Sequence, residues 1–122
     1  MLASSGVIID PFLGAARQAA LVRARQVSPV DLVRAYLDRI DRLDGRLRAY
    51  ITVTREAALH AAQAAEDAVT RGAPLGPLHG VPFAVKDQFA TRGVRTTAGS
   101  RILADNVPDE DATVVALSLI HI

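Results

Sequence analysis

The chain has 122 residues, 50% of them hydrophobic and 22% charged, a balance that predicts a packed core and excludes an intrinsically disordered segment. Its 14 Lys and Arg against 13 Asp and Glu leave a formal charge of +1, which argues against a surface for nucleic acid or anionic lipid. There is no cysteine, and no run of residues approaches the ~20 apolar residues of a membrane-spanning helix. We therefore expect a soluble, cytoplasmic protein.

Two amphipathic helices are predicted in the first third of the chain. Residues 12–26 form the first, with apolar or small residues at helical spacing at Leu13, Ala16, Ala20 and Val27. The second begins at Ser28, because a hydroxyl at the N-cap, Pro29 at the first helical position and Asp31 in the first turn all favour a helix start. We expect it to run to Asp44, to end at Gly45 and to bury Leu32, Tyr36, Leu37, Ile40 and Leu43.

The middle of the chain predicts a strand, a third helix and a loop. Residues Ala49 to Val53 are β-branched and aromatic, which favours a strand, and Thr54 can cap the next helix. That helix, Arg55 to Arg71, is rich in alanine and ends at Gly72. The loop that follows, Gly72 to Pro82, holds three glycines and three prolines.

A second strand, Val81 to Val85, is predicted from a continuous apolar run, which is typical of strands buried on both faces. Lys86 follows it directly. An ammonium group held among apolar neighbours is destabilised relative to the free amine, so a lysine in this position can act as a general base. The simpler interpretation is a solvated lysine at a strand end. Asp87 would point to the opposite side of the strand and is not assigned as its partner.

Three blocks of sequence, in order, closely resemble the amidase signature family. They are Gly76 to Asp87, Thr96 to Ser100 and Val107 to Val115, and the resemblance extends upstream to Ser28. It implies an α/β fold, in which this chain supplies the N-terminal helices and the first strands of a large mixed sheet flanked by helices. Residues 1–116 would be the N-terminal part of an amidase domain.

The resemblance also implies a mechanism. In this family a Ser–cis-Ser–Lys triad hydrolyses amide bonds, and Lys86 matches the lysine. Both serines of the family lie in a Gly/Ser-rich region downstream of the lysine, which this sequence does not reach, so we expect the chain by itself to be an inactive N-terminal fragment. Ser100 lies in a different loop and is not assigned as the nucleophile.

Other polar residues are interpreted as structural. His60, His79 and His121 are too scattered to suggest a metal site, and we predict neither metal nor cofactor. Asp111 is expected to be the N-cap of a last helix. The uncharged residues Leu117 to Ile122 resemble a translated sequencing adapter, so we expect a non-native tail, the alternative being the true end of a truncated relative.

Three functions remain open at this stage. The first is an amidase acting on a small-molecule amide, with no nucleic acid or membrane partner and an oligomeric state that the sequence does not indicate. The second is the A subunit of a glutamine-dependent tRNA amidotransferase, which shares the signature, although the loop Thr96 to Ser100 looks more like a general amidase. The third is a non-catalytic module that binds a partner through its helices before Gly72.

Overall fold

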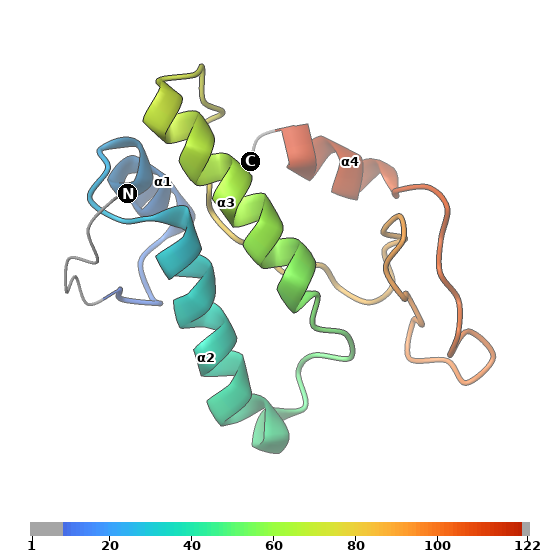
Figure 1. The fold of residues 1–122 in the computed structure, drawn as a ribbon. Coiled ribbons are helices and arrows are strands. Elements are labelled where there is room, and N and C mark those ends of the chain that lie inside the picture. The colour runs from blue at the N-terminus through green and yellow to red at the C-terminus, as the bar shows by residue number, and fades with distance from the viewer. Residues whose placement is uncertain (1–8, 121–122) are drawn as a thin grey trace.

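The computed structural model describes residues 9–120, and within them the chain forms four helices and no strand (Figure 1). The helices are α1 (Ala15–Arg23), α2 (Pro29–Leu47), α3 (Arg55–Arg71) and α4 (Thr113–Ile120). In Figure 1, α3 lies between α2 on one side and α4 on the other. A long irregular segment, residues 72–112, connects α3 to α4.

Helix α2 begins as predicted. The Ser28 hydroxyl oxygen accepts hydrogen bonds from the amides of Val30 at 3.1 Å and Asp31 at 3.3 Å, which satisfies two of the free donors of the first turn. Its predicted end was wrong, because the helix passes through Gly45 to Leu47. Arg48 ends it in the left-handed conformation (φ 50°), and its amide donates to the carbonyl of Asp44 at 2.7 Å.

The core is built by α1, α2 and α3. One cluster joins Val22, Val27, Leu32 and Val69, and a second joins Val30, Val33, Leu37 and Ala62. On α2 the predicted residues Leu32 and Leu37 are buried, whereas Tyr36, Ile40 and Leu43 are half-buried. Val30 and Val33, which the prediction omitted, are also buried and turn the inner face of α2 toward α3.

The buried face of α1 differs from the predicted one. Ala16 and Ala20 are exposed, and the helix buries Gln18, Ala19 and Val22 instead. The buried side chain of Gln18 is satisfied only in part, because its Oε1 has no hydrogen-bond partner among the described residues. The Gln18 amide nitrogen donates to the Leu13 carbonyl at 2.6 Å and to the Tyr36 hydroxyl at 2.7 Å, so it links α1 to α2.

Helix α3 has the predicted bounds, Arg55 to Arg71. At its end Gly72 adopts φ 68°, and the guanidinium of Arg25 donates to the carbonyl of Val69 at 2.9 Å. At its start the side chain of Thr54 makes no capping hydrogen bond, contrary to expectation. An exposed ion pair between Arg55 and Asp41, 2.6 Å apart, links the start of α3 to α2.

Neither predicted strand is present in residues 9–120. Residues Ala49 to Val53 and Val81 to Val85 are irregular, and the sole pairing of strand type is an isolated bridge between Thr91 and Val94. A strand is stable only when a neighbour pairs with its backbone, and the described part of the chain supplies no such neighbour. Of the expected α/β fold, the described residues therefore show the helices but not the strands.

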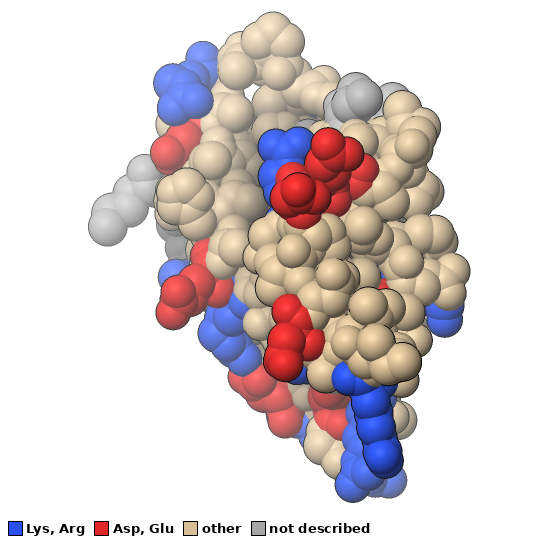
Figure 2. Space-filling view, turned by 90° about the vertical axis from the view of Figure 1, so that its right-hand side faces the viewer, with Lys and Arg blue, Asp and Glu red and all other residues tan. Residues whose placement is uncertain are grey.

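The segment between α3 and α4 forms a separate side of the molecule. Figure 2, which views the molecule from this side, shows mainly residues without charge, with small separate groups of both signs. Helix α4 starts at Thr113 and runs past Ala116 to Ile120, so the expected non-native tail begins inside it and remains a prediction, with 121–122 outside the described residues. None of the described helices combines the length and apolar character needed to cross a bilayer.

Candidate functional site

Lys86 follows an irregular segment, Val81 to Val85, that is buried only at its beginning. Val81 is 7% exposed, whereas Phe83 is 46% and Val85 37% exposed, and Lys86 itself is exposed. The buried strand expected ahead of Lys86 is not present in this chain, and its burial in a longer protein stays a prediction. Within the described residues no strand pairs with the backbone of Phe83 to Val85. The carbonyl of Lys86 accepts a hydrogen bond from the Phe89 amide at 3.0 Å, which starts a turn.

Asp87, the residue after Lys86, is bonded to a loop about ten residues farther along the chain. Its carboxylate accepts hydrogen bonds from the Thr97 amide at 2.9 Å, from the Thr97 hydroxyl, and from the Gly99 amide at 3.3 Å. Its main-chain carbonyl accepts a fourth from the Ala98 amide at 2.8 Å. We call these four hydrogen bonds the Asp87 clamp.

The clamped loop is a tight turn. Ala98 and Gly99 both adopt positive φ, 50° and 67°, and the Ser100 amide donates to the Thr97 carbonyl at 2.8 Å. Ser100 lies in this loop, as predicted, and its hydroxyl oxygen accepts from the Ile102 amide at 3.2 Å. Thr96 and Thr97 are both buried, so the polar start of the loop faces inward and is satisfied by hydrogen bonds.

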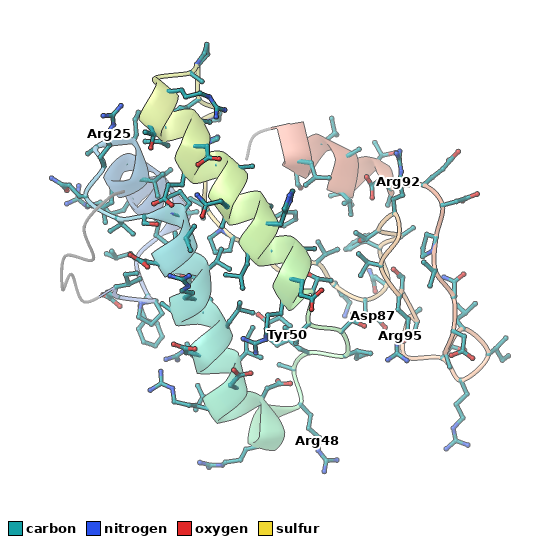
Figure 3. All side chains as sticks on the ribbon, viewed as in Figure 1. Arg25, Arg48, Tyr50, Asp87, Arg92 and Arg95 are labelled. Atoms are coloured by element: carbon teal, nitrogen blue, oxygen red, sulfur yellow. The ribbon has the colours of Figure 1, made fainter. Side chains whose placement is uncertain are left out.

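The hydrogen bonds around Asp87 lower the pKa of its carboxyl from the ordinary value of 3.8. The hydroxyl of Thr97 has the largest effect, followed by the Thr97 amide, because donors stabilise the ionised form. Partial removal from water opposes them, and the Gly99 amide and the positive charge of Arg95 add smaller contributions. Figure 3 labels Asp87 and Arg95, both of which lie in the segment between α3 and α4.

Further hydrogen bonds join this loop to the approach of α4. The Thr96 amide donates to the carbonyl of Asn106 at 2.9 Å, and the side-chain amide of Asn106 donates back to the Thr96 carbonyl at 2.9 Å. Asp111 was predicted to cap α4, but its carboxylate accepts from the Arg92 amide at 2.7 Å. Residues 87–112 are thus connected internally although they contain no regular strand.

The remaining polar candidates do not assemble into a site. His79 contacts the Ala65 carbonyl of α3 through Nε2 at 3.0 Å, and His60 is exposed on α3. No three His, Cys, Asp or Glu residues in the described part of the chain are grouped to hold a metal ion. A hollow of about 570 Å³ lies against α2 and includes no residue of the Lys86 segment among its lining residues, which are Ile9, Pro11, Ala35, Asp38, Arg39, Asp41 and Arg42.

Comparison with protein families and known sequences gives consistent matches. Residues 31–118 match the family model Amidase. The chain is 49% identical over 104 residues to the A subunit of the glutamyl-tRNA(Gln) amidotransferase of Moorella thermoacetica, covering 85% of this chain and 21% of that protein. It is 54% identical over 92 residues to the protein of the same name from Geobacter sulfurreducens, covering 75% and 19%. The chain thus spans about a fifth of the length of these relatives.

Solved structures of similar fold were also found. A bacterial aryl acylamidase described as belonging to the amidase signature enzymes superposes with a TM-score of 0.74 at 33% identity, over 84% of this chain and 21% of that one. A structure from work on a vestigial protein complex and the origins of an s-triazine catabolic enzyme gives a TM-score of 0.82 at 31% identity, over 89% and 24%.

Proposed function

The chain belongs to the amidase family, and from this premise we propose that it is part of a longer enzyme that hydrolyses carboxylic amide C–N bonds, with Lys86 as the base. One structural observation supports assigning the role of base to Lys86 within this family. The two motif blocks that contain Lys86 and the loop Thr96 to Ser100 are separate in sequence but are joined by the Asp87 clamp. Lys86 is therefore placed beside an ordered turn.

The chemistry requires a base because a serine hydroxyl is a weak nucleophile until its proton is removed. In the proposed mechanism the neutral amine of Lys86 accepts the proton of a bridging serine, and that serine accepts the proton of the attacking serine. The proton then passes to the leaving amine as the C–N bond breaks, and water hydrolyses the acyl-enzyme. Both serines would come from residues beyond this chain, so the chain alone should release no ammonia from an amide.

The test is substitution of Lys86 in the full-length enzyme. Lys86→Ala should lower the turnover of simple amides by about 10²- to 10⁴-fold, the usual contribution of general acid–base catalysis. Lys86→Arg should be equally poor, because a guanidinium stays protonated and cannot act as a base. Ammonia release measures activity and circular dichroism verifies folding. Turnover at the wild-type level in Lys86→Ala, or ammonia release by the 122-residue chain, would refute the proposal.

A second candidate is supported by the names of the curated relatives. The proteins from Moorella thermoacetica and Geobacter sulfurreducens are named as A subunits of glutamyl-tRNA(Gln) amidotransferases, whereas one of the similar solved structures is an aryl acylamidase. In an amidotransferase, the same Lys86 would serve to release ammonia from glutamine. The two functions are separated by assaying the full-length protein with glutamine, with and without mischarged tRNA and the other subunits, and with aryl amides. The preferred amide donor decides between them.

No observation favours the third alternative, a helical interaction module. Such a module needs a free apolar helix face for its partner. The apolar faces of α1, α2 and α3 are turned toward one another and form the two core clusters.

A further inference from the structure

We propose that Asp87 is a positioning residue that fixes the direction of Lys86 by clamping the backbone after it to the turn Thr97 to Gly99. This inference rests on the proposed function of Lys86 as the base. It begins from geometry, since every hydrogen bond of the Asp87 clamp joins the residue next to Lys86 to one short turn.

The clamp acts on the main chain as well as the side chain. The Asp87 carbonyl accepts from the Ala98 amide at 2.8 Å, and the Lys86 carbonyl accepts from the Phe89 amide at 3.0 Å. Both peptide groups that follow the Cα of Lys86 therefore have fixed orientations. The preceding residues Phe83 to Val85 have exposed side chains and form no ladder within residues 9–120. The restraint on Lys86 thus comes mainly from its C-terminal side.

The hydrogen bonds of the Asp87 carboxylate indicate a structural role in the turn. An ionised carboxylate accepts hydrogen bonds and donates none, and here its two oxygens take three donors of the turn. The two ion pairs found among the described residues are Arg34 with Asp31 and Arg55 with Asp41, so neither engages Asp87. Asp87 is therefore assigned to the turn rather than to the ammonium group beside it.

The turn itself depends on these bonds. Ala98 has φ 50°, a left-handed conformation that is unfavourable for a residue with a Cβ. Its neighbour Gly99 also has positive φ and donates its amide both to the Asp87 carboxylate and, at 3.1 Å, to the Thr97 hydroxyl oxygen. Loss of the carboxylate would leave these donors without their shared acceptor, and the buried Thr97 would lose the partner of its hydroxyl group.

The experiment compares four single variants of the full-length enzyme and repeats one of them in the Lys86→Ala background. Asp87→Asn replaces one acceptor oxygen by a donor, and Thr97→Val removes the hydroxyl from the other side of the same bond. Thr97→Ser keeps the hydroxyl, and Asp105→Asn removes an exposed carboxylate from the same segment as a matched control. Amide hydrogen exchange at Thr97 and Gly99 reports the clamp, and kcat and KM report catalysis.

If Asp87 acts through Lys86, Asp87→Asn and Thr97→Val should each lower kcat by about 10- to 100-fold, the effect of a small misplacement of a catalytic group. KM should stay within about twofold of wild type, as expected when only the chemical step is affected. Exchange at the Gly99 amide, which loses one of its two acceptors in either variant, should accelerate by about tenfold, the consequence of one lost hydrogen bond. Thr97→Ser and Asp105→Asn should behave as wild type. In a Lys86→Ala background, Asp87→Asn should have no further effect on kcat.

Three results would overturn the inference. Wild-type kcat in both Asp87→Asn and Thr97→Val would show that the clamp does not matter for catalysis. An equal loss of kcat from Asp87→Asn with and without Lys86 would show a general structural role. Wild-type turnover in Lys86→Ala would refute the proposed role of Lys86 as the base, whatever hydrogen exchange shows. This result therefore differs from the first two, which concern Asp87 alone. Because Thr97→Val removes the same hydrogen bond, the inference can still be tested if Asp87→Asn fails to fold.

Discussion

At the residue scale, the sequence resemblance predicts a role for Lys86 but none for Asp87. Strand alternation placed Asp87 opposite Lys86 and assigned it no partner, since nothing near it in sequence pairs with it. Its partners Thr97 and Gly99 lie ten and twelve residues away. The available signal was the block Thr96 to Ser100, which has small residues and hydroxyls typical of a hydrogen-bonded turn, but its acceptor could not be predicted from local pattern.

The lowered pKa of Asp87 predicts how the turn responds to acid. The folded state binds this proton less tightly than the unfolded chain, whose carboxyl has the ordinary value of 3.8. The clamp therefore contributes stability above pH 3.8, and this contribution is lost as the pH falls through the lowered pKa. Titration of the Asp87 carboxyl carbon signal by NMR should give a midpoint below 3.8, and Thr97→Val should raise it. A midpoint at or above 3.8 in the wild-type chain would contradict the geometry.

At the element scale, the start of α2 was predicted correctly but its end was not. The start of α2 follows from Ser28 and Pro29, which act on the first turn alone. Its end was predicted at Gly45, but that glycine lies inside the helix, and Arg48 takes the left-handed position. The carboxylate of Asp44 accepts the amides of Ala49 at 2.7 Å and Tyr50 at 3.2 Å, which holds the chain in the turn after Arg48.

Two substitutions at the end of α2, one at Gly45 and one at Arg48, should each stabilise the protein. Gly45→Ala should raise the free energy of unfolding by about 0.5–1 kcal/mol, because alanine suits a helix interior and no atom lies within 4 Å of the added Cβ. Arg48→Gly should add about 1 kcal/mol by removing the left-handed strain of a residue with a Cβ. Urea unfolding followed by circular dichroism measures both. Ala in place of Arg48 is the control, since it keeps the strain and should give no gain.

At the scale of the whole molecule, the two halves of the chain differ in how much apolar surface they bury. The buried hydrophobic residues of the described chain all precede Gly72, except Val81 and Val115. After Gly72 several large apolar side chains are exposed, among them Phe83, Val85, Ile102, Val107 and Val114. The helical half has its own core, whereas the second half is held by hydrogen bonds around Asp87 and Asn106. We expect the rest of an amidase to cover this surface.

This exposed surface predicts that the 122-residue chain self-associates. Sedimentation velocity should show oligomers that increase with concentration, and a dye that binds apolar surface should fluoresce in its presence. Replacing Phe83 and Ile102, which are 46% and 94% exposed, by serine should weaken both signals without loss of helix content. In the full-length enzyme the same pair should instead lower stability, because these side chains would be buried there. A chain that stays monomeric at all concentrations and does not raise the dye fluorescence would contradict this prediction.

The sequence by itself determined the three N-terminal helices and the family, because caps, helical periodicity and motif blocks act over a few neighbouring residues. Tertiary structure alone decided which face of α1 is buried, where α2 ends, and that Asp87 is bound to the turn after Thr96. It also left Ala49 to Val53 and Val81 to Val85 without a strand within residues 9–120. These outcomes depend on groups far apart in the chain, since a buried face needs an opposing face and a strand needs a neighbour to accept its hydrogen bonds.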